Sequence, residues 1–452
     1  MKNYKIALIG LGARCGGLYN VLKGREYVDI VAVCDVYQDR CENMVQKIVE
    51  NGRHAPNMYH DYRQCLDTEK PDIAVITTSW LPHIEISIYA MERGIIALLV
   101  LWLGLSIFAW VKPATELSEA ERRKLAQFPE ISLSSILNGS FTGGFESYAT
   151  DQFPLREFFR SIKSRFHLQL LGQLDNNDIY LADGYAAKIE YPLNDASLSH
   201  AKDRIGHIYA KYLQNSDCRV MLSIVPDKGY YLAEPNGYPA LDCDALVDSI
   251  RSAATFDSYI DLFDSLKISD YYKTDTHWRQ ESILKAADAL CEALGIPLSS
   301  ENQFNEVAIS KPFYGVYKGQ AALPMDAEQI VTLRNDMLDS CRVFNFETSK
   351  YTSIYDDSKL SSRDLYDIYL SGAAALLRIE NPAQQNGRHL VVFRDSFGSS
   401  MVPLLVHGYE TVTLVDTRYM SPDILGQFVE FTNQDVLFLY SATVMNNSSA
   451  LK

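Results

Sequence analysis

Three residues in the second half of the chain have side chains that together can activate a nucleophile. Asp275 stands two residues before His277, so a carboxylate and an imidazole meet at one strand end or loop. Such a carboxylate holds the imidazole in one tautomer and stabilises the imidazolium that forms. Ser396, in an Arg-Asp-Ser-Phe-Gly run, supplies a hydroxyl. We therefore predict Ser396 as nucleophile, His277 as general base and Asp275 as the orienting acid of an acyl-transfer site.

Ser396 also has the local sequence of an exposed nucleophile. It follows the apolar run His389–Phe393 and precedes Gly398 and two further serines. This pattern is typical of a tight turn from a strand into a helix, where the N–H of Ser396 or Phe397 can hold an oxyanion. Two simpler interpretations stay open. The serine can cap a helix, and the Asp-x-His pair can bind a metal, although no third ligand stands in a matching motif.

A second group of polar and aromatic residues lies in the glycine-containing loop Phe313–Gly319. Tyr314, Tyr317 and Lys318 can contact a sugar there, because aromatic faces and cations suit polyhydroxylated ligands; packing within the loop explains them equally well. Trp278, next to the histidine, is expected to pack behind the three chemical residues rather than bind a ligand.

Composition excludes some classes of protein. The 452 residues are too many for one ordinary core, which predicts two or three domains. The formal net charge of −15 argues against nucleic-acid binding, which needs a basic face to neutralise phosphates. The eight cysteines include no C-x-x-C pair, so zinc and thioredoxin-like sites are disfavoured. Isolated buried thiols are favoured over two disulfides among the last four cysteines.

The first residues have the pattern of a dinucleotide-binding unit. The apolar strand Lys5–Ile9 runs into a glycine-rich turn and a helix, and a second strand, Val28–Cys34, ends at an acid about 20 residues beyond the glycines. Glycines let the backbone approach a pyrophosphate at the helix N-terminus, and the acid suits a ribose hydroxyl. The predicted cofactor-binding residues are Gly10, Gly12, Gly17 and Asp35.

Residues 1–94 resemble the N-terminal half of the Gfo/Idh/MocA oxidoreductases. The shared features are the glycine turn, the acid after the second strand, and the threonine-rich end of strand Asp72–Thr78 followed by Pro82 and His83. In that family a Glu-Lys-Pro motif supplies the lysine of the chemistry, whereas Gly94 is followed here by an apolar run. The resemblance implies NAD(P) as the candidate cofactor. Hydride transfer is not expected, because the lysine and the substrate domain are missing.

Residues 95–111 form an uncharged apolar run that predicts a transmembrane helix. Its length is near the minimum of about 17 residues for a membrane span, and Trp110 beside Lys112 resembles an interfacial anchor. A buried core helix is the alternative. The basic residues that follow the run would place the C-terminal part in the cytoplasm, in conflict with the second resemblance below, so we suspect a gene fusion or an assembly join near Gly94.

Residues 112–137 read as a connector and residues 138–452 as an α/β domain. Apolar strands alternate with helices there, which predicts a mainly parallel sheet covered on both faces, with chemical groups at the C-terminal ends of strands. The expected hairpin spans 177–189, the expected strands span 219–226, 389–393, 411–415 and 435–440, and the expected helices include 198–213 and 279–294.

Four segments resemble those of the DHHW proteins, which are relatives of the SGNH-like acetyltransferases of alginate O-acetylation. These segments are Phe145–Tyr148, Asp151–Arg156, Thr274–Trp278 and Arg394–Gly398. The resemblance covers residues 95–452 and implies a single-pass protein of the cell membrane with its C-terminal domain outside the cytoplasm. It also implies a membrane-bound O-acyltransferase as acyl supplier, a polysaccharide as acceptor, and no cofactor for acyl transfer.

The same resemblance maps a catalytic triad onto Asp275, His277 and Ser396. Their order along the chain is circularly permuted relative to ordinary SGNH hydrolases, in which the serine comes first. Thr276 stands where the family name implies a histidine, but it lies between two triad residues and need not affect the chemistry.

The expected architecture is therefore a truncated Rossmann-like unit, one transmembrane helix and an SGNH-like α/β domain. The expected function is that of an O-acetyltransferase or esterase acting on a cell-surface or exported polysaccharide. Two alternatives remain: a nucleotide-binding oxidoreductase or its inactive remnant, and an assembly protein whose triad is vestigial.

Overall fold

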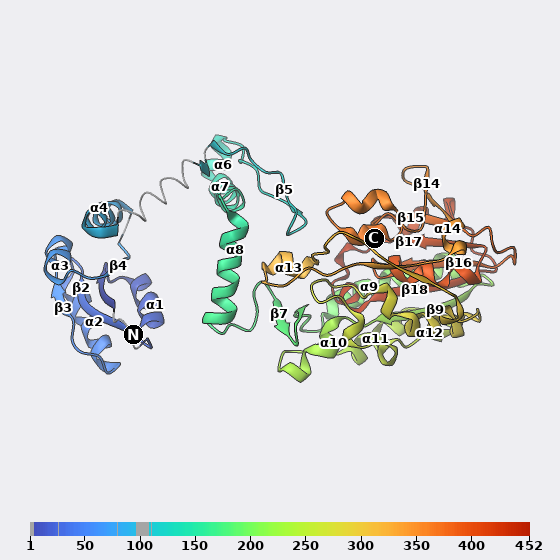
Figure 1. The fold of residues 1–452 in the computed structure, drawn as a ribbon, viewed down its shortest axis with the longest axis horizontal. Helices are drawn as coiled ribbons and strands as arrows, with labels where there is room; N and C mark the ends of the chain where they lie inside the picture. The colour runs from blue at the N-terminus through green and yellow to red at the C-terminus, as the bar shows by residue number, and fades with distance from the viewer. Residues whose placement is uncertain (1–3, 26, 79, 96–107, 110) are drawn as a thin grey trace. The chain divides into compact units, whose positions relative to one another are not determined.

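The computed structural model describes residues 4–25, 27–78, 80–95, 108–109 and 111–452. The chain divides into two compact units, Met1–Ala114 and Thr115–Lys452 (Figure 1). Each unit has its own sheet and its own hydrophobic core, so each is described by itself.

The N-terminal unit contains a four-stranded parallel sheet in the order β3-β2-β1-β4. Its apolar strands are buried by helices, as expected of a βαβ arrangement. Gly10 ends β1 at φ +86°, and a Cβ there would lie 2.7 Å from the Thr78 side chain, so this turn requires glycine. The elements are β1 (Tyr4–Ile9), α1 (Ala13–Leu22), β2 (Val28–Cys34), α2 (Gln38–Glu50), β3 (Asn57–Tyr59), α3 (Tyr62–Glu69), β4 (Ile73–Ile76) and α4 (Trp80–Ala90).

The predicted transmembrane helix over 95–111 is not supported. Most of that run lies outside the described residues, and among the helices of the described ranges none is long and apolar enough to cross a bilayer. This finding contradicts the predicted fold class in this part and the predicted single-pass location in a cell membrane. The expectation rested on the length and apolarity of the run and on Trp110 beside Lys112, and none of these sequence features requires a continuous helix.

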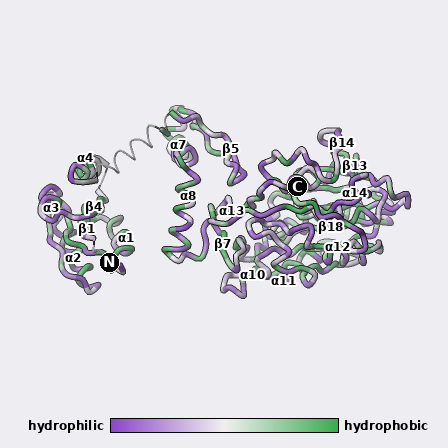
Figure 2. The backbone as a smooth tube through the Cα atoms, in the orientation of Figure 1, coloured by the Kyte–Doolittle hydropathy of each residue, from purple (hydrophilic) through white to green (hydrophobic). Residues whose placement is uncertain are grey.

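The C-terminal unit is built on an eight-stranded sheet in the order β10-β9-β18-β16-β17-β15-β13-β14. The strands are β9 (Arg219–Val225), β10 (Ser258–Tyr259), β13 (Arg342–Asn345), β14 (Lys350–Thr352), β15 (Leu376–Glu380), β16 (His389–Arg394), β17 (Thr411–Val415) and β18 (Asp435–Ser441). Figure 2 shows the apolar character of its central strands.

The sheet is mixed, with four parallel and three antiparallel strand pairs, where the sequence predicted a mainly parallel sheet. The pairs from β10 to β17 are parallel, but β15, β13 and β14 continue the sheet with antiparallel pairs. The apolar strands of the parallel part were predicted from the sequence, whereas β13, β14 and β15 were not. The short connection between β13 and β14 fits antiparallel pairing, because a parallel pair would need a long crossover.

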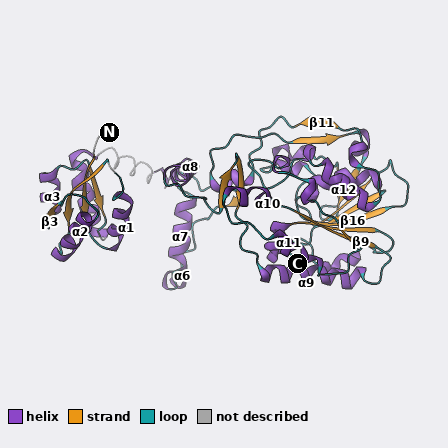
Figure 3. Ribbon diagram, turned by 90° about the horizontal axis from the view of Figure 1, so that it is seen from below, coloured by secondary structure: helices purple, strands orange, loops and turns teal. Residues whose placement is uncertain are grey.

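Helices cover both faces of this sheet (Figure 3). On one face α9 (Asp195–Ile208) and α11 (Cys243–Arg251) pack on β9 and β18, and on the other α12 (Leu284–Leu294) packs on the same strands. The helix predicted over 279–294 begins only at Leu284. The preceding residues form a 3₁₀ turn, Gln280–Ser282, whose Gln280 side chain donates to the Ser400 carbonyl and accepts from the Leu333 N–H.

The start of the C-terminal unit is a small antiparallel hairpin followed by helices. The hairpin pairs β5 (Leu117–Ser118) with β6 (Arg123–Lys124), and a second hairpin pairs β7 (Ile179–Ala182) with β8 (Tyr185–Lys188) where the sequence predicts one. The helices are α6 (Leu133–Leu137), α7 (Ser140–Asp151) and α8 (Arg156–Arg165). The Arg123 guanidinium fastens the first hairpin to α7 through two hydrogen bonds to the Asp151 carboxylate, of 2.8 and 2.6 Å.

Candidate active site

A tight loop holds the aspartate and the histidine side by side. Tyr271 and Trp278 form an antiparallel bridge, and the Tyr272 N–H donates to the His277 carbonyl at 3.0 Å. Inside this closed loop the His277 N–H donates to Asp275 Oδ1 at 3.1 Å. The side chain of Asp275 is thereby turned toward the imidazole that follows it.

The structure brings together the three residues predicted to do the chemistry. His277 Nδ1 lies 2.6 Å from Asp275 Oδ1, and His277 Nε2 lies 2.8 Å from Ser396 Oγ. Ser396 stands in the turn between β16 and α15 (Gly398–Met401), at the C-terminal end of a central strand. Its hydroxyl faces His277, and the N-cap of α15 is Phe397, so the serine does not serve as a helix cap.

The Asp275 carboxylate is fully buried and held at both oxygens. Oδ1 bonds His277, and Oδ2 accepts from the Val316 N–H at 2.8 Å and lies 3.6 Å from Arg122 Nη1. Burial alone would raise the pKa of Asp275, but the charge and hydrogen bond of His277, with Arg122 and the Val316 N–H, bring the pKa below its usual value. A carboxylate that stays ionised can stabilise a neighbouring imidazolium.

Aromatic rings fix the plane of the imidazole. The His277 ring stacks on Tyr366 with centroids 4.0 Å apart and planes 12° apart, and the Phe397 ring lies 5.1 Å away. Trp278 is buried, as expected of a residue that packs behind the site. The histidine therefore has its position set by a carboxylate on one nitrogen and its orientation set by ring packing.

Asp395, next to the serine, has a structural contact on each oxygen. Oδ1 accepts from the Phe397 N–H at 3.0 Å, and Oδ2 accepts from the Ser441 N–H at 2.7 Å, which ties the turn to the end of β18. The Phe397 N–H is thus engaged. Of the two N–H groups considered for an oxyanion, the one on Ser396 is left as the candidate.

Sequence reasoning missed two charged residues beside Asp275. Arg122, in the β5–β6 turn, forms an ion pair with Asp364 as well as approaching Asp275. In the sequence Arg122 is one of the basic residues that follow the apolar run 95–111. Nothing in its local sequence signals a role at a loop more than 150 residues away, because only the tertiary fold brings the hairpin there.

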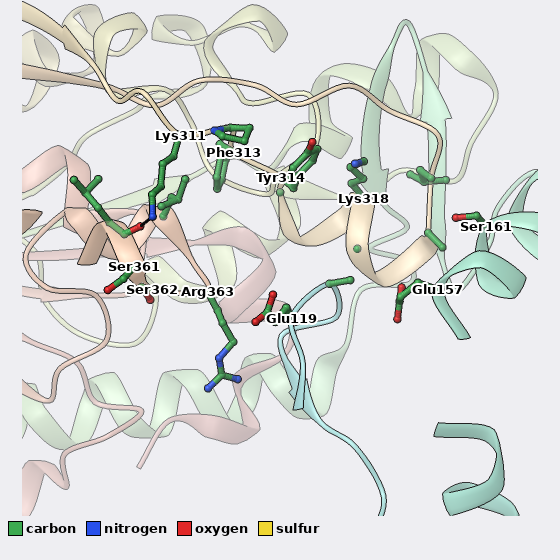
Figure 4. A pocket seen from close by; sticks show the side chains of 18 residues that line it. Glu119, Glu157, Ser161, Lys311, Phe313, Tyr314, Lys318, Ser361, Ser362 and Arg363 are labelled. Atoms are coloured by element: carbon green, nitrogen blue, oxygen red, sulfur yellow. Dashed lines mark hydrogen bonds between the residues drawn. The ribbon is translucent and has the colours of Figure 1, made fainter. Parts of the chain in front are cut away.

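A pocket of about 520 Å³ is lined in part by residues next in sequence to those that contact Asp275 and His277, although neither these two nor Ser396 lines it (Figure 4). Tyr314, which is half exposed, and Lys318 form part of its wall, with the Lys318 ammonium 3.7 Å from the centre of the Tyr314 ring. Tyr317 is instead buried and donates to Thr276 Oγ1 at 3.1 Å. Of the three loop residues singled out in the sequence, two face a cavity and one packs inside.

Of the residues predicted to bind a dinucleotide, Gly10 and Gly12 lie in the β1–α1 turn and Asp35 directly follows β2, whereas Gly17 lies within α1. Gly12 directly precedes α1, and a Cβ on Gly12 or Gly17 would meet no other atom within 4 Å. The Asp35 carboxylate is buried and turned toward this turn, because it accepts from the Leu11 N–H at 2.6 Å and the Tyr37 N–H at 3.0 Å.

Comparison with known proteins matches two parts of the chain, and residues 258–415 belong to the first of them. Residues 258–415, which include Asp275, His277 and Ser396, match the family described as DHHW protein. A solved DHHW family protein from Eubacterium siraeum is 22% identical and has a TM-score of 0.49, covering 61% of this chain and 95% of its own. PatB1 from Bacillus cereus, solved with a sulfonyl adduct, is 16% identical with a TM-score of 0.48, covering 59% of this chain and 95% of its own.

The N-terminal region has different relatives. A glycosyl hydrolase family 109 protein from Streptomyces niveus is 32% identical over 94 residues, which are 20% of this chain and 19% of that protein. One from Shewanella woodyi is 31% identical over 111 residues, 24% of each chain. The chain spans about a fifth of the length of the curated relatives it matches. The chain thus combines a DHHW family region with an N-terminal region similar to Gfo/Idh/MocA oxidoreductases.

Proposed function

We propose that the C-terminal unit transfers an acyl group through a covalent ester on Ser396. Residues 258–415, which match the DHHW protein family, include Ser396 and its two partners. The observation that carries the proposal is the continuous hydrogen-bonded line from Asp275 through His277 to Ser396, with separations of 2.6 and 2.8 Å. A serine is a weak nucleophile unless a base within hydrogen-bond reach takes its proton, and this geometry supplies one.

The proposed reaction has two halves. His277 Nε2 removes the proton of Ser396 while Oγ attacks the carbonyl carbon of an acyl donor, and the ionised Asp275 stabilises the imidazolium. His277 then returns that proton to the departing oxygen of the donor, which leaves Ser396 acylated. In the second half His277 takes the proton of an acceptor hydroxyl while its oxygen attacks the ester carbonyl, and His277 then returns that proton to the departing Ser396 Oγ, which restores the serine.

We propose a carbohydrate hydroxyl as the acceptor, with water as the acceptor if the enzyme is an esterase. The pocket of Figure 4 supports a carbohydrate, because an exposed tyrosine ring and several polar groups line it. Its wall includes Gly315 and Leu365, each next to a residue that contacts the site: the Val316 N–H bonds Asp275, and the Tyr366 ring stacks on His277.

The test is hydrolysis of p-nitrophenyl acetate by the full chain. We expect Ser396→Ala and His277→Ala to lower kcat by about 10³-fold or more, as deletions within a triad generally do. Ser147→Ala, at an exposed serine of α7, is the matched control and should leave the rate unchanged. A fluorophosphonate probe should label Ser396 in the wild type and fail to label Ser396→Ala.

A folded wild-type chain that neither turns over acetate nor takes up the probe would contradict the proposal. The competing oxidoreductase function gains nothing from the site, because the lysine of the Gfo/Idh/MocA motif has no counterpart after Gly94. Transferase and esterase are separated by the product: addition of oligosaccharide acceptors to the acetate assay should yield an O-acetylated sugar only for a transferase.

A further inference from the structure

The β5–β6 turn carries one side chain into the wall of the site. Arg122 sits at that turn with φ +53°, and its guanidinium is mostly buried, with 16% of the side chain exposed. Nη1 forms an ion pair with Asp364 and lies 3.6 Å from Asp275 Oδ2, while Nη2 donates to the Tyr314 carbonyl at 3.0 Å. One planar group therefore contacts three segments that are far apart in sequence.

Each contacted segment holds a part of the proposed machinery. Tyr314 begins the stretch whose Val316 N–H donates to Asp275 at 2.8 Å. Asp364 begins the stretch whose Tyr366 ring stacks on His277, and the Asp364 carboxylate itself accepts from the Tyr366 N–H at 3.0 Å. Arg122 thus fastens the groups that fix the carboxylate and the imidazole, without contacting Ser396.

The positive charge of Arg122 has a second effect, which is to keep Asp275 ionised beside Asp364. Asp275 and Asp364 lie close enough to repel one another, and the pKa of Asp364 is raised by burial and by the charge of Asp275. The basic side chains that face Asp275 are His277, Arg122 and, from α10 (Lys228–Leu232), Lys228. Two neighbouring carboxylates without a cation between them tend to share one proton, and a proton on Asp275 would remove the charge that stabilises the imidazolium.

The hairpin is seated closely enough to place the arginine reproducibly. A Cβ on Gly319, in α13 (Val316–Ala321), would overlap the backbone carbonyl of Ala120, so the hairpin approaches α13 within a distance that only glycine permits. Arg160 of α8 donates to the Gly319 carbonyl at 2.9 Å from the other side. The turn that carries Arg122 is therefore packed against the loop that it contacts.

We propose that Arg122 is a positioning residue of the acyl-transfer site: it locks the Tyr314 and Asp364 segments around Asp275 and keeps that carboxylate ionised beside a second one. The expected effect of Arg122 on the rate of acyl transfer rests on the proposed function. Its geometry also predicts an effect in the resting protein, so the two can fail separately.

The experiment compares Arg122→Met with Arg123→Met in the full chain. Arg123 neighbours Arg122 but fastens the same hairpin to α7 through Asp151, so Arg123→Met loosens the hairpin while it keeps the Arg122 guanidinium at the site. We expect Arg122→Met to lower kcat for p-nitrophenyl acetate by about 10²-fold, as small displacements of catalytic groups do. We also expect the acid limb of its pH–rate profile to move to higher pH. Arg122→Lys should restore the acid limb without restoring the full rate, because lysine keeps the charge and loses the planar fork.

A second measurement needs no turnover. Proton NMR follows the low-field imidazole proton between His277 and Asp275, which is identified by its absence in His277→Ala. As the pH is lowered, we expect this signal to vanish at a higher pH in Arg122→Met than in the wild type or Arg123→Met. An inert wild type that shows this shift overturns the proposed function and upholds the positioning role. An active wild type overturns the positioning role if Arg122→Met keeps its kcat and pH profile, or if Arg123→Met reproduces the same changes.

Discussion

The indole N–H of Trp278 donates a 2.8 Å hydrogen bond to the hydroxyl of Ser400, one helical turn beyond Ser396. The same hydroxyl lies 2.7 Å from the Tyr366 hydroxyl, and all three side chains are buried. One serine therefore connects the loop that carries His277, the turn that carries Ser396 and the ring that stacks on the imidazole. These two hydrogen bonds of Ser400 therefore help to fix the distance between His277 and Ser396.

Substitution of Trp278 by phenylalanine tests these hydrogen bonds. We expect the free energy of unfolding to fall by about 1–3 kcal/mol, because a buried donor is removed and packing is lost, and the rate with p-nitrophenyl acetate to fall with it. Urea unfolding and kcat are measured for Trp278→Phe, Ser400→Ala and the double variant. The losses should be less than additive, since both variants break one bond; strictly additive losses would show that the two residues act independently.

Gly315 offers a test of the wall around Asp275. A Cβ on Gly315 would overlap the backbone carbonyl of Thr274, and the Gly315 N–H donates to Thr274 Oγ1 at 3.0 Å. We expect Gly315→Ala to destabilise the chain by about 1–3 kcal/mol and to lower kcat, because the loop must move away from Asp275. Thermal unfolding and acetate hydrolysis check both effects.

Gly143→Ala is the control for that substitution. Gly143 lies within α7, and a Cβ there would meet nothing within 4 Å. Alanine should raise the stability of the helix by up to about 1 kcal/mol and leave the rate unchanged. A Gly315→Ala variant as stable and as active as Gly143→Ala would show that the loop has room to relax.

Site residues could be predicted from the sequence in two cases: where their partners lie nearby in the chain, and where their residue type is unusual at the end of a strand. Asp275 and His277 are two residues apart, and Ser396 follows an apolar strand, so residue type and spacing predicted a group that the fold places within hydrogen-bond distance. Arg122 and Asp364 could not be found in this way, because a charge on a surface hairpin has the same local pattern whether or not tertiary packing buries it.

The errors in the fold have similar causes. The parallel strands β9, β16 and β18 are buried on both faces and appear as continuous apolar runs, which periodicity detects. Strand β15 interrupts its apolar run with Arg378, and β14 is short and half exposed, so neither stands out from a loop. The span predicted over 95–111 rested on hydropathy without any local signal of tertiary context.

Lys228 should make stability depend on pH. Its ammonium is buried and donates to the Tyr272 carbonyl at 2.9 Å, and burial lowers the pKa of Lys228 to about 7, against the opposing charge of Asp275. The unfolded chain has an ordinary lysine pKa of about 10.4, so between pH 7 and 10 it binds more protons than the folded chain. The lysine's contribution to stability therefore improves as pH rises through this window and is constant below it.

Lys228→Met removes that dependence. We expect the stability of the variant relative to the wild type to improve as pH falls from 10 to 7, by up to about 4 kcal/mol, and then to level off. Urea unfolding at pH 6, 7, 8.5 and 10 measures the difference. Lys273→Met, at an exposed lysine, is the control and should give a flat difference; a flat difference for Lys228→Met would show that the buried ammonium keeps its proton throughout.

Asp35 decides what to expect of the nucleotide-binding unit. Its carboxylate is 5% exposed and accepts from the backbone N–H groups of Leu11 and Tyr37, so a ribose hydroxyl must compete with the glycine turn for it. We expect the full chain to bind NADH weakly, with a Kd of about 1 mM, or roughly 4 kcal/mol. Titration of NADH fluorescence measures the Kd, and Asp35→Ala should change it little, because the carboxylate is already engaged by the protein. A micromolar Kd that Asp35→Ala abolishes would show instead that Asp35 leaves the Leu11 amide to hold the ribose, and that this unit keeps a working dinucleotide site.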